Sequence, residues 1–304
     1  MTDSDISFES GSLWPAIVNR TRRSLDIGAL RPIETEQETI VDGGISFDVR
    51  VISSLARKAH EANPGVRPPD FNPFLPYEED LFVANISESH VGILNKFPVA
   101  DNHLLIVTRA FEEQTFLLTE QDFQAMCACM REFDGLAFYN SGEIAGASQR
   151  HKHIQIVPLP LTSDGQATPV EGAIAAADLS SGVGQCPTLP FANAIVRLDD
   201  LDALPVTNAA SALQDHYHSM LRSMSLMDEP DNTKNYNLLA TRSWMMLVPR
   251  SREHFEGISI NALGFAGELL VMDRNQLSTL RERGPMAALL AVGVLRHPYL
   301  SLTT

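Results

Sequence analysis

The chain has 304 residues and a formal net charge of −15, and its 44% of hydrophobic residues is typical of a globular protein. This length is enough for one large domain or two closely packed halves with a proper core. The negative charge argues against non-specific binding to nucleic acids or anionic membranes. The acidic N-terminus lacks the apolar run of a secretory signal, and the longest apolar stretch, residues 285–295, is too short to span a bilayer. Three cysteines suit a reducing compartment, so we expect a cytoplasmic protein.

The first half of the chain predicts several strands around one well-marked helix. Strands are expected at residues 81–86, 103–109, 136–142 and 151–157, which are rich in β-branched and apolar residues. The helix is expected over 119–135, where Thr119 and Asp122 form a capping box and Gly135 is the C-cap. Its predicted buried stripe consists of Phe123, Met126, Cys127 and Met130.

The second half follows a long connection. Residues 157–192 are rich in proline, glycine and small residues, and only residues 171–178 within them favour a helix. Beyond this connection we predict a helix over 208–224, strands over 236–242 and 244–250, and a last helix over 274–284 that Gly284 and Pro285 end.

Two segments share a pattern of four apolar residues, Thr or Pro, Arg, two variable positions and Glu. They are residues 104–112 and 245–253. Any two buried strands look alike, so the match is compatible with chance. It is equally compatible with two related halves of one unit, of which only the first keeps the histidines described next.

His151, His153 and Gln155 follow one another at two-residue spacing in the strand expected at 151–157. In an extended strand such residues share one face at intervals of roughly 6.6 to 7 Å, while Ile154 and Ile156 point into the opposite, buried face. The residues alone leave three readings open: a metal site, a solvated strand face, or nucleotide chemistry. The metal reading lacks a third ligand at short spacing, and the turn-rich segment upstream could hold an anion through its backbone N–H groups.

The segment 140–161, NSGEIAGASQRHKHIQIVPLPL, resembles the active-site segment of diadenosine tetraphosphate (Ap4A) phosphorylases, also called ATP adenylyltransferases. That family belongs to the histidine-triad superfamily and is related to galactose-1-phosphate uridylyltransferase. Further blocks similar to the family lie at residues 72–83, 94–123, 236–253 and 258–271.

The resemblance implies an α+β fold with a histidine-triad-like, mostly antiparallel sheet and packed helices. It also implies two related halves in one compact unit. We expect an N-terminal catalytic half at residues 1–190, which holds the histidine strand, and a C-terminal ATP adenylyltransferase half at residues 191–304.

By the same resemblance, His153 attacks the α-phosphorus of the substrate and forms an adenylyl-histidine, while His151 positions the strand. Gln155 takes the place of the third histidine of the hydrolytic relatives. A glutamine amide donates a hydrogen bond to phosphate but does not relay a proton near pH 7. We therefore expect a transferase that converts Ap4A and phosphate reversibly into ATP and ADP.

Nucleotide contacts are also implied, and several cations near them can offset polyphosphate charge. The implied substrate-binding residues are Lys58, Asn95, Lys96, Asn140, Gly146, Ala147, Ser148, Gln149 and Lys152, with Ser259 and Asn261 on the second nucleotide. Arg150 stands where many relatives have proline, so it either adds phosphate affinity or faces solvent. His103 is expected to be structural.

The resemblance further implies Mg²⁺ bound to the polyphosphate, since no dedicated metal-binding cage is visible in the sequence. The expected partners are nucleotides and phosphate, without nucleic acid or membrane, and the oligomeric state stays open. Two alternatives remain. One is an adenylyl sulfate:phosphate adenylyltransferase that releases sulfate, and the other is a non-catalytic dinucleotide-binding sensor.

Overall fold

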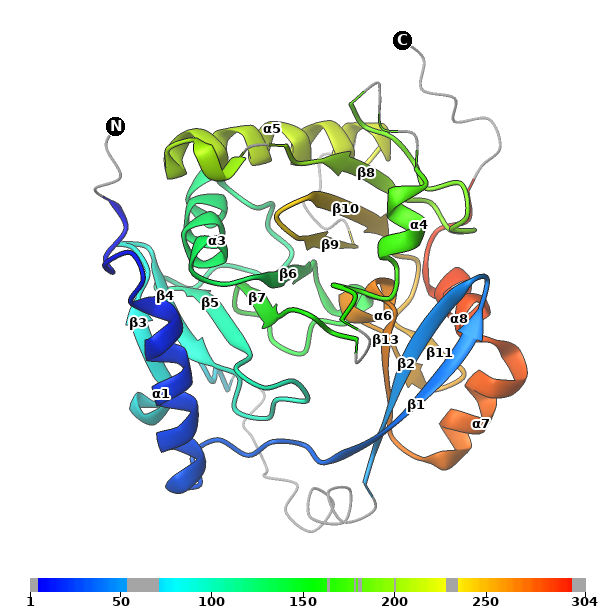
Figure 1. Ribbon diagram of the computed structural model, residues 1–304, viewed down its shortest axis with the longest axis horizontal. Helices are drawn as coiled ribbons and strands as arrows, with labels where there is room; N and C mark the ends of the chain where they lie inside the picture. Colours follow the sequence, from blue (N-terminus) through cyan, green and yellow to red (C-terminus); the bar gives the residue numbers. More distant parts are fainter. Residues whose placement is uncertain are drawn as a thin grey trace.

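The computed structural model describes residues 5–53, 71–162, 165–177, 179, 182–199, 201–227 and 235–296. Lys58 lies outside these ranges. The strands of the central sheet are β3 (Phe82–Asn85), β4 (His90–Leu94), β5 (Leu104–Thr108), β6 (Gly135–Asn140), β7 (His153–Pro158), β8 (Ala194–Arg197), β9 (Tyr236–Ala240) and β10 (Trp244–Pro249). They lie in the order β3-β4-β5-β7-β6-β9-β10-β8, and every neighbouring pair is antiparallel (Figure 1).

A smaller sheet stands beside the central one. It contains β1 (Thr35–Asp42), β2 (Ile45–Ile52) and β13 (Glu268–Val271), and β13 pairs in parallel with β2. A short hairpin joins β11 (His254–Phe255) and β12 (Ile258–Ser259). The helices are α1 (Leu13–Asp26), α3 (Glu120–Glu132), α4 (Glu171–Ala175), α5 (Val206–Ser223), α6 (Ala262–Ala266), α7 (Arg274–Arg283) and α8 (Pro285–Val292), with 3-10 turns η2 (Glu79–Leu81), η3 (Glu143–Ala145) and η4 (Leu201–Ala203). The fold is α+β, as the sequence predicted.

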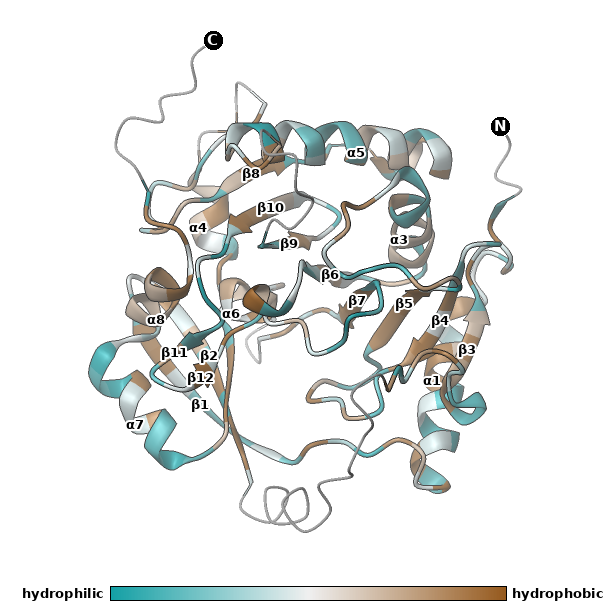
Figure 2. Cartoon of the chain, turned by 180° about the vertical axis from the view of Figure 1, so that it is seen from behind, coloured by the Kyte–Doolittle hydropathy of each residue, from teal (hydrophilic) through white to brown (hydrophobic). Residues whose placement is uncertain are grey.

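The two faces of the central sheet are covered differently. Helices α1, α3 and α5 pack on one face, and residues of the small sheet and of α4, α6, α7 and α8 form the core against the other (Figure 1). Figure 2 shows the strands of the central sheet in mostly hydrophobic colours and the outer helix α7 as largely hydrophilic. Ile154 and Ile156 of β7 lie in the core under α3 and α5. Because side chains alternate along a strand, His153 and Gln155 face away from these helices.

Helix α3 begins as predicted but ends differently. Thr119 and Asp122 form the capping box, and the predicted stripe is buried. The expected C-cap at Gly135 is wrong, because the helix ends at Glu132, the C-cap Phe133 is in extended conformation, and Gly135 is the first residue of β6. A Cβ atom at Gly135 would lie 2.7 Å from Cγ2 of Ile156, so the close approach of β6 to β7 requires glycine there.

The chain order of the central sheet reveals two related halves. In the first, the sequence β5–α3–β6–β7 places its strands in the order β5-β7-β6, and in the second, β8–α5–β9–β10 places its strands in the order β8-β10-β9. The halves meet where β6 pairs with β9. The counterpart of β7 (HIQIVP) is therefore β10 (WMMLVP), and Trp244 and Met246 stand where the first half has His153 and Gln155. The repeated pattern in the sequence matched β5 with β10, which the topology does not support.

The predicted boundary between residues 190 and 191 falls in the connection from α4 to β8. Strands of one half pair with strands of the other across this boundary, since β13 pairs with β2 and β9 pairs with β6. Among the described residues, none of the helices combines the length and the apolar character that a bilayer crossing needs.

Candidate active site

The backbone of His153 is held at both its N–H and its carbonyl. The side chain of Gln114, from the loop after β5, accepts a hydrogen bond from the His153 N–H at 2.8 Å and donates one to the His153 carbonyl at 3.2 Å. The same amide nitrogen donates to the carbonyl of Asn140 at the end of β6, at 3.0 Å. Sequence reasoning missed Gln114, which lies in the similar block 94–123. Gln114 thus fixes the backbone of His153 relative to the neighbouring strand β6.

The ring of His153 has one nitrogen bonded and one free. Its Nδ1 lies 2.8 Å from the carbonyl oxygen of His151, and since a carbonyl only accepts, Nδ1 carries the proton. Burial lowers the pKa of His153 to about 4, and the bond to the His151 carbonyl only partly opposes this, so the ring is neutral at pH 7. No described residue bonds Nε2. Nε2 is also not one of the fully buried side-chain atoms that lack a hydrogen-bond partner in the described part of the chain. Its lone pair is therefore accessible.

His151 is fixed in the opposite tautomer. Its Nε2 lies 2.8 Å from the carbonyl oxygen of Thr108 and 3.2 Å from that of Ala110, so Nε2 donates, and Nδ1 accepts from the side-chain amide of Asn72 at 3.0 Å. The Phe74 ring packs against both histidines, at centroid distances of 5.7 Å from His151 and 5.2 Å from His153. With His151 1% and His153 5% exposed, the reading as a solvated strand face is wrong.

Gln155 extends the same face of β7. Its Oε1 lies 3.0 Å from Nε2 of His103, whereas none of the described residues bonds its amide nitrogen. His103 is buried, and its other ring nitrogen contacts the side chain of Asn95. A histidine from the start of β5 thus joins the face that the sequence assigned to His151, His153 and Gln155 alone.

The glycine-containing turn after β6 lies against the C-terminal segment. Gly146 has φ +87°, and a Cβ atom there would lie 2.8 Å from the carbonyl oxygen of Ile260 and 2.9 Å from Cα of Asn261. Asn140 strengthens this junction, because its Oδ1 accepts from Asn237 Nδ2 at 2.8 Å and from the Ala262 N–H at 2.9 Å. The predicted contacts of the first and second nucleotide therefore lie on adjoining segments.

A buried arginine stabilises this turn. Arg250 donates to Asn237 Oδ1 and to the carbonyl of Ala145, and its remaining donors reach the carbonyls of Val292, Arg252 and Glu253. Because all five N–H groups are used within the protein, this cation organises the loops and is not available to a polyphosphate.

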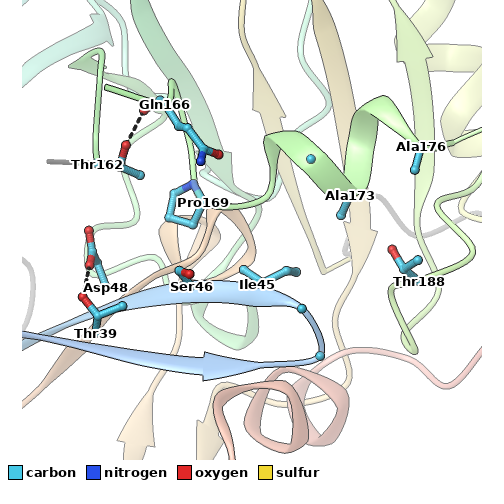
Figure 3. A pocket seen from close by; sticks show the side chains of 13 residues that line it. Thr39, Ile45, Ser46, Asp48, Thr162, Gln166, Pro169, Ala173, Ala176 and Thr188 are labelled. Carbon is cyan, nitrogen blue, oxygen red and sulfur yellow. Dashed lines mark hydrogen bonds between the residues drawn. The ribbon is translucent and has the colours of Figure 1, made fainter. Parts of the chain in front are cut away.

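Several of the predicted binding residues line two clefts. One, of about 470 Å³, lies between the loop after β5 and the glycine-containing turn and includes Ala147, Ser148 and Gln149. The other, of about 160 Å³, includes Ser259 and Asn261 together with the buried Glu268, whose Oε1 lacks a partner in the described chain. A larger cavity of about 600 Å³ between the β1–β2 hairpin and α4 contains none of the predicted site residues (Figure 3).

Lys152 points away from the face of β7 that carries His153 and Gln155. It alternates with His151 and His153, so its side chain points to the α3 side, where it is 1% exposed. Its Nζ lies 2.6 Å from Asp122 Oδ2, 3.1 Å from Glu112 Oε2 and 3.1 Å from the Leu117 carbonyl, which uses all three donors. The prediction that Lys152 binds substrate is wrong.

The other predicted cations differ in their surroundings. Lys96 is partly exposed, and its Nζ pairs with Glu78 at 2.6 Å. The largely exposed Arg150 pairs with Glu113 at 2.5 Å and lines the cleft of about 470 Å³. Lys58 falls outside the described residues. Within those residues no group of three His, Cys, Asp or Glu side chains lies close enough together to hold a metal ion.

Known proteins resemble this chain over most of its length. Residues 3–176 match the family described as Ap4A phosphorylase N-terminal domain, and residues 187–295 match the ATP adenylyltransferase C-terminal domain. The diadenosine 5',5'''-P1,P4-tetraphosphate phosphorylase 2 of Saccharomyces cerevisiae is 30% identical over 290 residues, which cover 84% of this chain and 86% of the relative. Protein APA1 of the same organism is 28% identical and covers 88% of this chain and 89% of the relative.

Solved structures agree with these sequence matches. The crystal structure of yeast Ap4A phosphorylase Apa2 superposes with a TM-score of 0.79 at 25% identity and covers 96% of this chain and 97% of that one. The same enzyme in complex with Ap4A also gives a TM-score of 0.79, at 26% identity, and covers 96% of this chain and 100% of that one. With its His-x-His-x-Gln strand and both domain matches, this chain belongs to the Ap4A phosphorylase family.

Proposed function

We propose that this protein is a nucleotidyltransferase that converts Ap4A and inorganic phosphate into ATP and ADP, and that it also runs the reverse reaction. The observation that carries this proposal is the ring of His153. It is neutral at pH 7, its Nδ1–H is held by the His151 carbonyl, and its Nε2 has no hydrogen-bond partner among the described residues. In a family of Ap4A phosphorylases, a fixed and accessible imidazole nitrogen is a nucleophile for phosphorus.

The reaction divides into two displacements. The Nε2 lone pair of His153 attacks an α-phosphorus, the bond from this phosphorus to the bridging oxygen breaks, and ATP leaves. The ring now carries a positive charge, which the Nδ1–H donor shares with the His151 carbonyl. An oxygen of inorganic phosphate then attacks the same phosphorus, the P–N bond breaks, and ADP leaves with the ring neutral again.

We assign nucleotide binding to the segments around the two adjoining clefts. Asn140, Gly146, Ala147, Ser148 and Gln149 contact the first nucleotide, and Ser259 and Asn261 contact the second. Lys58 and Lys96 offset polyphosphate charge. The chemistry of the clefts supports this assignment, because backbone N–H groups of a turn and neutral side-chain donors recognise phosphate and ribose without a high positive charge.

A panel of donors and acceptors tests the proposed activity. The purified protein is incubated with radiolabelled Ap4A, with and without phosphate, and separately with adenylyl sulfate and phosphate. Phosphate-dependent release of ATP and ADP in equal amounts supports the proposal. Turnover of adenylyl sulfate but not of Ap4A, or binding of Ap4A without turnover under any of these conditions, contradicts it.

Gln155→His is expected to shift the products from ADP towards AMP. A histidine can relay a proton to water near pH 7, whereas the glutamine amide cannot. The total rate should fall on the order of 10- to 1000-fold, because the amide donor to the phosphate is lost. The AMP-to-ADP ratio is measured by chromatography over a range of phosphate concentrations.

The matched control is Gln37→His, which places the same substitution at an exposed position of β1. Its AMP-to-ADP ratio should equal that of the wild type. If the ratio for Gln155→His also stays at the wild-type value at every phosphate concentration, residue 155 does not decide between transfer and hydrolysis.

We further propose that Mg²⁺ reaches the site on the polyphosphate. The cleft beside Gln114 fits this mode, since it offers amides, hydroxyls and backbone groups, and its carboxylates, Glu113, Glu143 and Glu253, do not form a metal-binding group among the described residues. When bound, the cation neutralises negative charge on the transferred and leaving phosphates. Chelation by EDTA should lower the rate, and added Mg²⁺ should restore it without any change in the thermal stability of the nucleotide-free protein. A rate that EDTA leaves unchanged contradicts this proposal.

The proposed place of action is the cytoplasm. All three cysteines, Cys127, Cys129 and Cys186, are free and buried, as in proteins of a reducing compartment. Burial raises the pKa of Cys127 to about 12, so its thiol is unreactive and belongs to the core, as the sequence suggested. Fractionation of cells that produce the protein tests this placement.

A further inference from the structure

The strand of His153 has a histidine neighbour that takes no part in the two displacements. His103, at the start of β5, is buried, and its ring bridges two amide side chains. Its Nε2 lies 3.0 Å from Oε1 of Gln155, and its Nδ1 lies 3.2 Å from Nδ2 of Asn95. Asn95 in turn is anchored to the backbone, since its Oδ1 accepts from the Phe97 N–H at 3.1 Å.

The bond from the Phe97 N–H to Asn95 determines every donor and acceptor along the chain of hydrogen bonds from Asn95 through His103 to Gln155. A backbone N–H only donates, so the atom of Asn95 that faces Phe97 is its oxygen, and the atom that faces His103 is its NH₂ group. This group donates to Nδ1 of His103, which must be the unprotonated nitrogen of the ring. The proton therefore sits on Nε2 and is donated to Gln155, and the atom of Gln155 that faces His103 must be its oxygen.

The bond to His103 determines which end of the Gln155 amide is left for the substrate. With Oε1 bound to His103, the NH₂ group is the end left without a partner among the described residues. It lies on the same face of β7 as Nε2 of His153, which likewise has no partner in the described part of the chain. A glutamine that rotated freely could turn its oxygen towards a phosphate, where the partial negative charge of the amide oxygen is repelled by the negative phosphate oxygens. The bond to His103 removes this orientation.

The His103 ring also keeps its neutral protonation state. Burial lowers the pKa of His103 to about 4, against the raising effect of the bond to Gln155. The ring is therefore neutral at pH 7, and the tautomer with the proton on Nε2 persists where the enzyme works.

We propose that His103 is a positioning residue for adenylyl transfer. It locks the Gln155 amide with its N–H donors towards the transferred phosphate, and Asn95 sets its tautomer. This inference rests on the proposed function, because it assigns a role in that reaction. It also differs from the expectation that Asn95 acts through its own contact with the nucleotide, since both polar atoms of the Asn95 side chain are engaged within the chain.

The first test replaces His103 with Phe and with Gln. Phenylalanine keeps an aromatic ring beside Phe138, whose centroid lies 5.8 Å from that of His103, but cannot donate to Gln155. His103→Phe should lower kcat on the order of 10- to 100-fold, as expected for a misplaced catalytic donor, with a smaller change in KM. His103→Gln carries an N–H donor at the position of Nε2 and should restore a large part of the rate.

A double-mutant cycle separates positioning from general support of the fold. In a Gln155→Ala background there is no amide to hold, so His103→Phe should cause no further loss of kcat. Equal losses in the presence and absence of Gln155 would overturn the inference, as would wild-type kcat in His103→Phe. So would a failure of His103→Gln to restore activity although it melts at the wild-type temperature.

A measurement on the unaltered protein covers the case in which the Phe variant does not fold. The ¹⁵N chemical shifts of the His103 ring should show a neutral imidazole protonated on Nε2 at pH 7, and a ring protonated on Nδ1 overturns the inference. The outcomes also separate the two proposals. A wild-type protein without phosphorolysis removes the proposed function and this role with it, whereas an active wild type with an equally active His103→Phe removes only the role of His103.

Discussion

His153→Ala is expected to reduce both phosphorolysis and synthesis of Ap4A on the order of 10⁴- to 10⁶-fold, the range in which removal of a covalent nucleophile falls. Alanine has no atom that can form the P–N bond, and neither His151 nor His103 can replace it. Neither of those two rings has a free nitrogen, because both nitrogens of each ring are hydrogen-bonded within the protein.

Binding of nucleotides should largely survive this substitution. In the proposed assignment the affinity derives from the two clefts and from the turn that carries Gly146. His153 is held from behind by Gln114 and by the His151 carbonyl. Steady-state rates in both directions test the first part, and calorimetric titration with Ap4A tests the second. Incubation with labelled Ap4A should also label the wild type covalently and leave the variant unlabelled.

His216→Ala is the matched control, because this histidine lies on α5, on the other side of the central sheet from the His153 side chain. Its rate and its covalent labelling should equal those of the wild type. Substantial turnover by a pure His153→Ala preparation would remove His153 as the nucleophile and, with it, the two-displacement route.

Asp122→Ala is expected to lower the free energy of unfolding by about 3–5 kcal/mol, the range for breaking a buried ion pair. This is the largest loss of stability expected among the single substitutions proposed for this protein. Asp122 bonds Lys152 at 2.6 Å and His90 at 3.0 Å, and all three side chains are buried. Without the carboxylate, the Lys152 charge keeps, among the described residues, the partly exposed Glu112 as its single ionic partner. The capping box of α3 is lost as well.

The pH dependence of this effect has a defined sign. Burial by itself would raise the pKa of Asp122, but its bond to His90 and the charge of Lys152 outweigh burial and lower the pKa from 3.8 to about 2. A carboxyl whose pKa is lowered by folding contributes stability above its unfolded pKa and loses it as the pH falls towards the folded value. The difference between wild type and Asp122→Ala should therefore be full above pH 4 and shrink towards pH 2.

Urea unfolding at a series of pH values measures both effects. The double variant Asp122→Ala with Lys152→Met is the control, since it removes the uncompensated charge and should be more stable than Asp122→Ala alone. A single variant as stable as the wild type at pH 7 would contradict the role of this cluster. A stability difference that does not change between pH 5 and pH 2.5 would contradict the stated direction of the pKa shift.

Local sequence determined those features that depend on neighbours along the chain. The start of α3 was predictable because a capping box joins residues three apart, and its buried stripe because helical periodicity places such residues on one face. The alternation in β7 likewise separated His153 and Gln155 from Ile154 and Ile156. That same alternation places Lys152 on the buried side, so the sequence contained the signal against its role in substrate binding.

The tertiary structure decided what depends on strands far apart in sequence. β5 pairs with β7, and only this pairing brings His103 to Gln155, 52 residues away. The partners of Lys152 come from α3 and from the loop after β5, and the correspondence of β7 with β10 follows from the strand order alone. α8 escaped prediction as a helix because it is apolar on all sides and shows no stripe. A sequence pattern encodes which face of an element is buried, whereas the identity of the group across from that face is settled only when the elements pack together.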